Sequence, residues 1–258
     1  MAKVHFIGAG PGDPELITVK GARLLAEADV VVFAGSLVDR ELVRTYAHGA
    51  EVWDSAAMTL EETIRVMAGA VAAERRVVRL HTGDPAIYGA IQEQMAALEG
   101  LGIDYAVVPG VTSAFAAAAL LKQELTLPEV SQTVIFTRIE GKTPVPEREQ
   151  LAEIARIGAT LVIYLSVAMI DRVVAKLLAG AYTPATPAAV VCRASWPDEE
   201  AVEGTLADIA GKAKGAGISR QALIIVGDVL KARQEGLKAK SLLYDEGFSH
   251  EFRKGIVT

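Results

Sequence analysis

Gly8-Ala9-Gly10-Pro11-Gly12-Asp13-Pro14, which directly follows the apolar run at residues 4–7, is the stretch that decides the fold. An apolar run that ends in glycines and leads into a helical pattern is typical of a buried parallel strand with a ligand-binding loop at its carboxyl end. Asp13 can cap the helix predicted over residues 14–28, and Pro14 suits its first position, where a missing N–H costs nothing. The stretch therefore predicts an α/β fold.

The spacing of these glycines departs from the fingerprint of dinucleotide-binding proteins, which requires G-x-G-x-x-G. Gly8 and Gly10 fit, but Asp13 occupies the third glycine position. A carboxylate near the start of a helix would repel a pyrophosphate. The loop therefore predicts a ligand without phosphate at this point, and the alternative is a tight turn between a strand and a helix that binds nothing.

Short apolar runs and longer segments with helical spacing alternate along the whole chain, which predicts two tandem α/β domains, the first with a largely parallel sheet. A break in this pattern around Pro128 divides an N-terminal domain (1–124) from a C-terminal domain (125–230), and a polar tail (231–258) follows as a helix or an arm. The predicted strands cover residues 4–7, 29–33, 77–81, 105–108, 133–138, 160–166, 188–193 and 222–226. The predicted helices cover residues 14–28, 59–75, 87–100, 112–122, 147–157, 170–179 and 206–214.

Two further glycine-bearing loops follow predicted strands of the first domain, Thr82-Gly83-Asp84-Pro85-Ala86-Ile87-Tyr88-Gly89 and Pro109-Gly110-Val111-Thr112-Ser113. Asp84 can accept hydrogen bonds from a ligand ribose or amine, or simply cap the next helix. Thr112 and Ser113 can cap a helix too, or present hydroxyl and N–H groups to a ligand carboxylate. His81 can donate to a substrate carboxylate, or be a polar residue satisfied within the protein.

The composition limits the class of protein. The chain has 258 residues, a formal net charge of −6 and one cysteine, Cys192. A lone cysteine suits a reducing compartment, no apolar run reaches the roughly 20 residues that span a bilayer, and no signal peptide is visible, so we expect a cytoplasmic protein without a membrane partner. The acidic balance argues against nucleic-acid binding. Histidines at 5, 48, 81 and 250 lack metal-ligand spacing, so we expect no protein-bound metal.

The three loops, in this order, resemble those of the tetrapyrrole methyltransferases over residues 3–230. Several stretches resemble the branch of that family that methylates C11 of precorrin-4 or cobalt-precorrin-4, in cobalamin biosynthesis. The most distinctive are Thr137-Arg138-Ile139-Glu140-Gly141-Lys142-Thr143-Pro144-Val145-Pro146 and Ser195-Trp196-Pro197-Asp198-Glu199. The tail resembles the longer tails of aerobic-pathway enzymes, which favours metal-free precorrin-4 as the substrate.

The resemblance implies S-adenosylmethionine as the cofactor, S-adenosylhomocysteine as its product, a cofactor site in the cleft between the two domains, and a homodimer. Carried over by position, the cofactor contacts are Pro11, Thr82, Gly83, Asp84, Ile87, Thr112, Ser113, Leu165, Ala194 and Ala222. No catalytic base is evident, because the electron-rich carbon of a reduced tetrapyrrole needs little activation.

Such a substrate carries many carboxylates, so a net-negative protein must concentrate positive charge locally. Arg138 and Lys142 follow a predicted strand and are, with His81, the substrate-binding residues that we expect. Lys20 and Arg193 are weaker candidates, and the alternative for each is a solvated surface charge. Two other functions stay open: a ribosomal-RNA ribose methyltransferase, which the acidic balance disfavours, and a non-catalytic module that binds S-adenosylmethionine.

Overall fold

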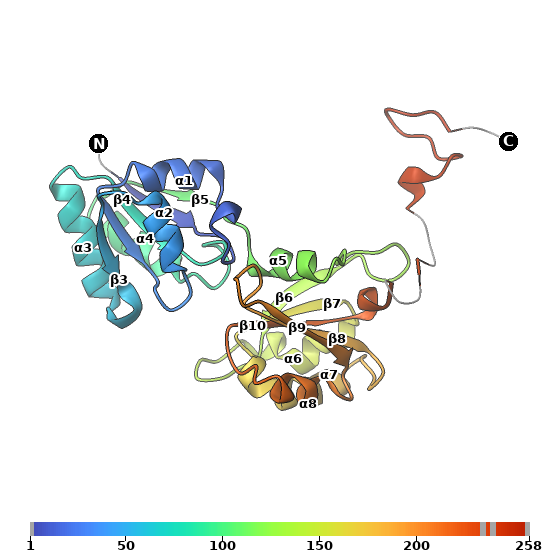
Figure 1. Ribbon diagram of the computed structural model, residues 1–258. Helices are drawn as coiled ribbons and strands as arrows, with labels where there is room; N and C mark the ends of the chain where they lie inside the picture. The colour runs from blue at the N-terminus through green and yellow to red at the C-terminus, as the bar shows by residue number, and fades with distance from the viewer. Residues whose placement is uncertain (1–2, 233–235, 238–240, 256–258) are drawn as a thin grey trace. The chain divides into compact units, whose positions relative to one another are not determined.

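The computed structural model describes residues 3–232, 236–237 and 241–255. By its internal contacts the chain divides into two compact units (Figure 1). The first comprises Met1–Ala117 together with Arg193–Glu199, and the second comprises Ala118–Cys192 and Glu200–Thr258. Both units are mixtures of helices and strands built on a five-stranded sheet.

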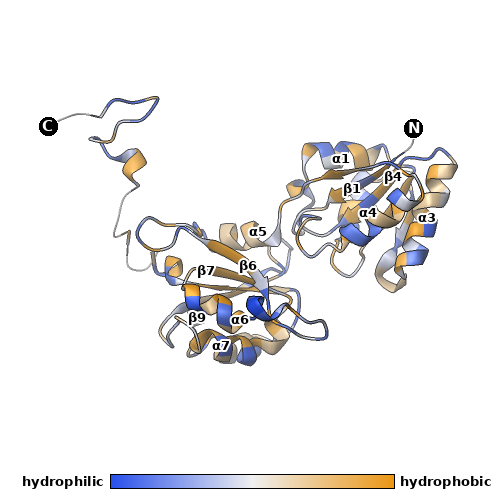
Figure 2. Ribbon diagram, turned by 180° about the vertical axis from the view of Figure 1, so that it is seen from behind, coloured by the Kyte–Doolittle hydropathy of each residue, from blue (hydrophilic) through white to orange (hydrophobic). Residues whose placement is uncertain are grey.

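The sheet of the first unit is parallel throughout and has the strand order β3-β2-β4-β1-β5. Helices α1 and α2 cover one face around Leu25 and Leu42, and α3 and α4 cover the other around Met67 and Leu98. Because both faces are buried, the central strands are mostly apolar (Figure 2). The elements are β1 (Val4–Gly8), α1 (Val19–Ala26), β2 (Val30–Phe33), α2 (Arg40–Tyr46), β3 (Glu51–Asp54), α3 (Leu60–Ala72), β4 (Val77–His81), α4 (Ile91–Gly100) and β5 (Tyr105–Val108).

The sheet of the second unit is mixed and has the strand order β6-β7-β10-β8-β9. Only β6 and β7 pair in parallel; the other neighbours are antiparallel. Side chains of α6, α7 and α8, among them Leu151, Leu177 and Ile209, bury one face of this sheet. The elements are β6 (Val134–Arg138), α6 (Leu151–Ile154), β7 (Thr160–Tyr164), α7 (Ile170–Leu178), β8 (Pro187–Cys192), β9 (Glu200–Thr205), α8 (Ile209–Gly215) and β10 (Ala222–Val226), and α5 (Ser113–Leu120) contains the division between the units.

The α/β class and all eight predicted strands are confirmed, but three predicted helices are wrong in part. The helix predicted over residues 14–28 is a 3-10 turn, Pro14–Leu16, which Asp13 caps as expected, followed by α1, which Thr18 caps. The helix predicted over residues 147–157 is broken into α6 and two 3-10 turns. The helix predicted from residue 87 begins only at Ile91, because Tyr88 and Ala90 have left-handed backbones.

Arg193–Glu199 belongs to the first unit by its contacts. The predicted division after residue 124 places this segment in the C-terminal domain instead. The predicted limits 1–124, 125–230 and 231–258 otherwise stay predictions. In the described part of the tail, residues 241–255 form an arm with one 3-10 turn, Leu242–Tyr244, and a bridge between His250 and Arg253. Of the rest of the predicted tail, residues 231–232 and 236–237 are described, and the prediction for 233–235, 238–240 and 256–258 lies outside the described residues.

Candidate functional site

The three glycine-bearing loops lie together at one edge of the first unit's sheet. They follow β1, β4 and β5, which are parallel and adjacent in the order β4-β1-β5, so their carboxyl ends meet. Gly10 and Gly83 join the first two loops by a pair of backbone hydrogen bonds, with N···O distances of 3.2 and 2.8 Å. The structure therefore brings together the loops that the sequence singled out.

Glycine is required where these loops touch. A Cβ on Gly8 would lie 2.5 Å from the Gly83 carbonyl oxygen and 2.6 Å from the Gly110 Cα. Gly83 also has a φ of +58°, a left-handed backbone that side chains disfavour. The three loops consequently pack backbone against backbone, which leaves their N–H and C=O groups close to any ligand at this edge.

Asp84 links the second loop to the third. Its Oδ1 accepts a hydrogen bond from the Ala86 N–H at 2.8 Å, and its Oδ2 accepts one from the Gly110 N–H at 2.9 Å. The first bond is the local turn that the sequence offered as an alternative, and the second is a cross-link that the sequence did not predict. Each oxygen keeps a second lone pair, so the half-buried carboxylate can still accept a bond from a ligand.

The other predicted cofactor positions of the first unit surround this cross-link. Thr112 precedes α5, and its Oγ1 accepts a 3.4 Å bond from the Ala114 N–H, so it caps the helix. Thr82, Ile87 and Ser113 are half-buried, whereas Pro11 is buried. The half-buried side chains retain surface that a ligand can contact.

Leu165, Ala194 and Ala222 divide between the two units. Ala194 is buried in the segment Arg193–Glu199 and so belongs to the first unit. Leu165 follows β7 in the second unit, where it has a left-handed backbone (φ +54°) and is 64% exposed. Ala222 begins β10 beside Cys192. Because its apolar side chain is exposed at the end of a strand, Leu165 is better placed than Ala222 to contact a ligand.

His81 is buried rather than open to a substrate. Its ring stacks on Phe6 with centroids 6.0 Å apart, and its Nε2 has no hydrogen-bond partner within the described residues. Burial, reinforced by the neighbouring Arg79 guanidinium, lowers the pKa of His81 to about 3. The imidazole is therefore neutral near pH 7, and the geometry favours the alternative of a core residue over a cationic contact with a carboxylate.

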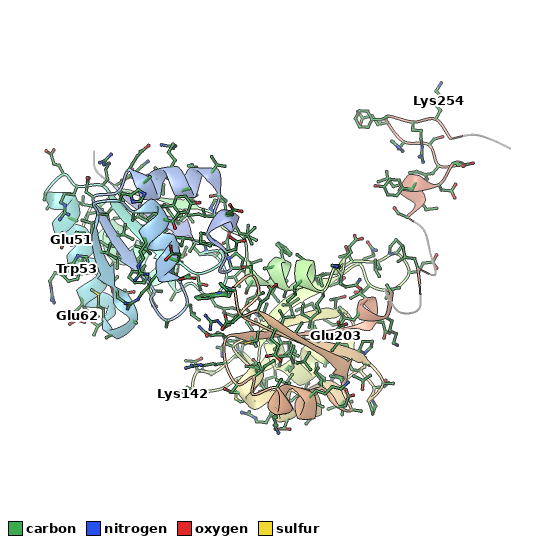
Figure 3. All side chains as sticks on the ribbon, in the orientation of Figure 1. Glu51, Trp53, Glu62, Lys142, Glu203 and Lys254 are labelled. Atoms are coloured by element: carbon green, nitrogen blue, oxygen red, sulfur yellow. The ribbon has the colours of Figure 1, made fainter. Side chains whose placement is uncertain are left out.

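Arg138 organises the loop that carries Lys142. Its guanidinium donates to the carbonyl oxygens of Pro144 at 2.6 Å, Thr143 at 3.2 Å and Ile139 at 3.4 Å. Lys142 is exposed on the same loop and points away from the body of the second unit (Figure 3). The two predicted substrate residues are thus close in the chain but differ in role, since only the Lys142 ammonium is free of such carbonyl bonds within the described residues.

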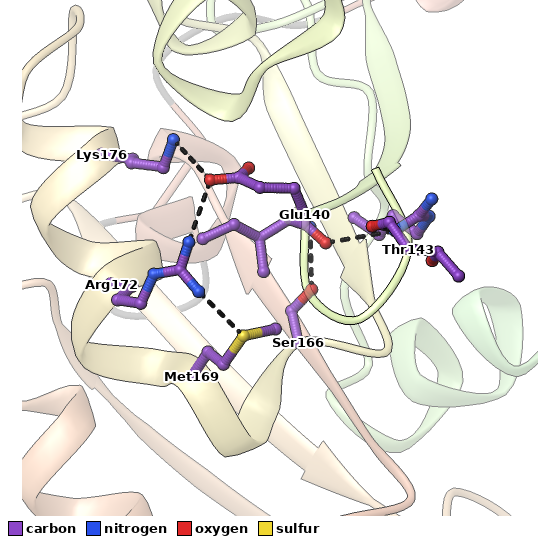
Figure 4. Close-up of polar contacts among 8 residues, drawn as sticks. Glu140, Thr143, Ser166, Met169, Arg172 and Lys176 are labelled. Carbon is purple, nitrogen blue, oxygen red and sulfur yellow. Dashed lines mark hydrogen bonds and ion pairs between the residues drawn. The ribbon is translucent and has the colours of Figure 1, made fainter. Parts of the chain in front are cut away.

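A charged cluster that the sequence did not predict lies at the base of that loop (Figure 4). The Glu140 carboxylate accepts from Lys176 at 2.9 Å and from Arg172 at 3.0 Å, and Arg172 also contacts the Met169 sulfur at 3.2 Å. The hydrogen bond from Lys176 lowers the pKa of Glu140. In the sequence these cations are ordinary polar positions of an amphipathic helix, so no signal there indicates that they anchor a loop.

The weaker substrate candidates have different surroundings. Lys20 is exposed on α1. Arg193 pairs with Asp198 at 2.5 Å, and its guanidinium lies 4.4 Å from the centre of the Trp196 ring. Trp196 in turn donates from Nε1 to the Pro11 carbonyl at 2.9 Å. Trp196 lies in one of the stretches that resemble the family, but its contact with the first loop is not predictable from the sequence.

Within residues 3–232, 236–237 and 241–255, no group of three or more His, Cys, Asp or Glu side chains is arranged to hold a metal ion. Among the helices in these ranges, none combines the length and the apolar character needed to cross a bilayer.

Comparison with known proteins gives a consistent result. A family model described as tetrapyrrole (corrin/porphyrin) methylases matches residues 3–210. The chain is 56% identical to a cobalt-precorrin-4 C(11)-methyltransferase of Methanocaldococcus jannaschii, over 98% of this chain and 96% of the relative. It is 50% identical to a precorrin-4 C(11)-methyltransferase of Pseudomonas aeruginosa, over 98% of this chain and 99% of the relative.

Solved structures show the same similarity. The crystal structure of a cobalt precorrin-4 methyltransferase superposes with a TM-score of 0.86 and 48% identity, covering 88% of this chain and 95% of that one. A uroporphyrin-III C-methyltransferase from Thermus thermophilus, in complex with S-adenosylhomocysteine, superposes with a TM-score of 0.73 and 32% identity. It covers 90% of this chain and 100% of that one.

Proposed function

Because the chain belongs to the tetrapyrrole (corrin/porphyrin) methylase family, we propose that it transfers the methyl group of S-adenosylmethionine to C11 of a precorrin-4 macrocycle. The observation that carries this proposal is the identity of 50–56%, over nearly the whole chain, to relatives named for that reaction. The names of the relatives do not explain how a cofactor would bind. The joined glycine loops of the first unit give a physical basis for that binding.

The cofactor contacts that we propose are Pro11, Thr82, Gly83, Asp84, Ile87, Thr112, Ser113 and Ala194 of the first unit, with Leu165 and Ala222 of the second. Two observations support this set. The loops present backbone groups at the carboxyl edge of a parallel sheet, and the first residues of α5 offer N–H groups to a carboxylate such as that of the methionine moiety. The Asp13 carboxylate disfavours a phosphate at this edge and is compatible with a cofactor that has none.

Methyl transfer of this kind breaks the bond between sulfur and the methyl carbon and forms a bond between that carbon and the macrocycle. The cofactor, when bound, supplies the activated methyl group and leaves as S-adenosylhomocysteine. The protein's part is to hold donor and acceptor in line, and such positioning can lower the barrier by roughly 7–11 kcal/mol. Lys142 would attract substrate carboxylates, and no residue is assigned as a catalytic base.

The metal content of the macrocycle is a separate question. Relatives of both kinds match 98% of this chain, the cobalt-precorrin-4 enzyme at 56% identity and the precorrin-4 enzyme at 50%. The resemblance of the tail to aerobic-pathway enzymes therefore does not discriminate between them. Metal-free precorrin-4 stays the substrate that we propose first, with cobalt-precorrin-4 as the alternative, and the higher identity to the cobalt-precorrin-4 relative supports that alternative.

One experiment tests the proposed reaction against its alternatives. The protein is incubated with S-adenosylmethionine carrying a labelled methyl group, together with precorrin-4, cobalt-precorrin-4 or ribosomal RNA. We expect label in a tetrapyrrole, with the new methyl group at C11 by mass and NMR spectra. Label only in RNA would support the ribose methyltransferase, and cofactor binding without transfer to any acceptor would support a non-catalytic module. The expected homodimer is tested by sedimentation of the same preparation.

A further inference from the structure

The segment Arg193–Glu199 lies between β8 and β9 in the chain, yet it is bound to the first glycine loop. Trp196 Nε1 donates to the Pro11 carbonyl at 2.9 Å, and the Asp13 N–H donates to Ser195 Oγ at 3.0 Å. Both hydrogen bonds join residues more than 180 positions apart. They hold the loop on both sides of Gly12.

Gly12 itself leaves the space that the indole ring fills. A Cβ on Gly12 would lie 2.9 Å from Trp196 Cγ and closer still to Cδ1 and Nε1, nearer than real Cβ atoms approach. Gly10 of the same loop has a left-handed backbone, with a φ of +80°, but Gly12 does not. The glycine at position 12 is therefore explained by the Trp196 ring and not by the conformation of the chain.

The ring is also held from within its own segment. The Arg193 guanidinium lies 4.4 Å from its centroid, at a distance typical of cation–π contact, and pairs with Asp198. The Ser195 N–H donates to the Glu199 carboxylate at 2.7 Å. These contacts do not involve the loop, so the segment holds the indole in place independently of Pro11 and Gly12. The indole can therefore set the position of the backbone at these two residues.

We propose that Trp196 is a positioning residue that orders the Pro11–Gly12 backbone before the cofactor binds. This inference rests on the proposed function, because Pro11 is one of the proposed cofactor contacts. A loop that is already ordered loses less conformational entropy when a ligand binds. The affinity for the cofactor therefore depends on the indole, although the indole does not contact the cofactor. Trp196 thus contributes to recognition of S-adenosylmethionine and its product through the loop.

The first test compares two tryptophans. Trp53 is a matched control, because its indole N–H also donates one 2.9 Å hydrogen bond, to Glu51 on an exposed strand. Trp196→Phe, which keeps a ring but loses the N–H, should weaken S-adenosylhomocysteine binding about five- to tenfold by calorimetry, the effect of one hydrogen bond. It should raise the KM for S-adenosylmethionine and leave the KM for the tetrapyrrole unchanged, whereas Trp53→Phe should change neither. A wild-type dissociation constant in Trp196→Phe would overturn the proposal.

The second test needs no cofactor. The chain has two tryptophans, so in a Trp53→Phe background the fluorescence comes from Trp196 alone. Gly12→Ala should displace the ring and increase its quenching by acrylamide, while Gly69→Ala, which adds a Cβ into open space, should not. Equal quenching in the two variants would overturn the proposed contact. Failure of the wild-type protein to bind S-adenosylhomocysteine would instead count against the proposed function, and the quenching result would still decide whether Trp196 holds the loop.

Discussion

At the scale of single residues, Asp84 carries a prediction about cofactor binding. Asp39 forms the same local turn, accepting from the Glu41 N–H at 2.9 Å, but lacks the cross-link to a second loop. Asp84→Ala should therefore lower the free energy of unfolding by about 1 kcal/mol more than Asp39→Ala. It should also weaken S-adenosylhomocysteine binding at least about fivefold, whereas Asp39→Ala should not. Urea unfolding and calorimetry measure the two effects, and equal affinities would contradict the assignment of Asp84.

Arg138 and Lys142 differ at the same scale. Lys142→Gln removes a solvated charge, so it should raise the KM for the tetrapyrrole about two- to fivefold, and less at high salt. Arg138→Gln removes three hydrogen bonds to loop carbonyls and should also accelerate trypsin cleavage after Lys142. Neither should change cofactor affinity. Arg148→Gln, which alters an exposed side chain that pairs with Glu149 at 3.8 Å, is the control. An unaltered KM for the tetrapyrrole in Lys142→Gln would exclude Lys142 from substrate binding.

At the scale of elements, the start of α3 gives a prediction about stability. Thr59 and Glu62 form a capping box: the Glu62 N–H donates to Thr59 Oγ1 at 3.2 Å, and the Thr59 N–H donates to Glu62 Oε2 at 2.8 Å. Thr59→Ala should cost about 1 kcal/mol of unfolding free energy, because an amphipathic helix with one buried face loses its cap. Thr59→Ser should restore most of this. If alanine and serine variants unfold at the same urea concentration, the cap contributes nothing.

The elements that the sequence did not predict share a physical cause. The edge strands β3 and β9 are largely exposed and carry charges, as at Glu51 and Glu203 (Figure 3), so they lack the apolar run that revealed the central strands. Helix α2 has seven residues, too few for a clear period. The three loops were predictable because glycine spacing is local, whereas the bond from Trp196 to Pro11 depends on where a distant segment folds back.

At the scale of the whole molecule, the two units use their sheets differently. In the first, every strand is parallel and the loops at one edge carry glycines that pack on one another. In the second, antiparallel pairs form most of the sheet, and the loop after β6 is held by Arg138 and the Glu140 cluster. Backbone contacts therefore organise the proposed cofactor loops, while side-chain charges organise the proposed substrate loop.

Burial of His81 predicts how the first unit responds to acid. Its pKa is lowered to about 3 in the folded protein, so between pH 6.5 and 3 the unfolded chain binds a proton that the folded protein does not. The unfolding free energy that the neutral His81 contributes is therefore fully present above pH 6.5 and declines as the pH falls below this value. From pH 6.5 to 5, the wild-type protein should lose about 1.5 kcal/mol more unfolding free energy than His81→Phe. Tryptophan fluorescence in urea measures this, since Trp53 and Trp196 both belong to the first unit. His48→Phe, at an exposed position, should keep the wild-type dependence of the unfolding free energy on pH. The same wild-type dependence in His81→Phe would show that burial of the His81 imidazole does not set the acid response.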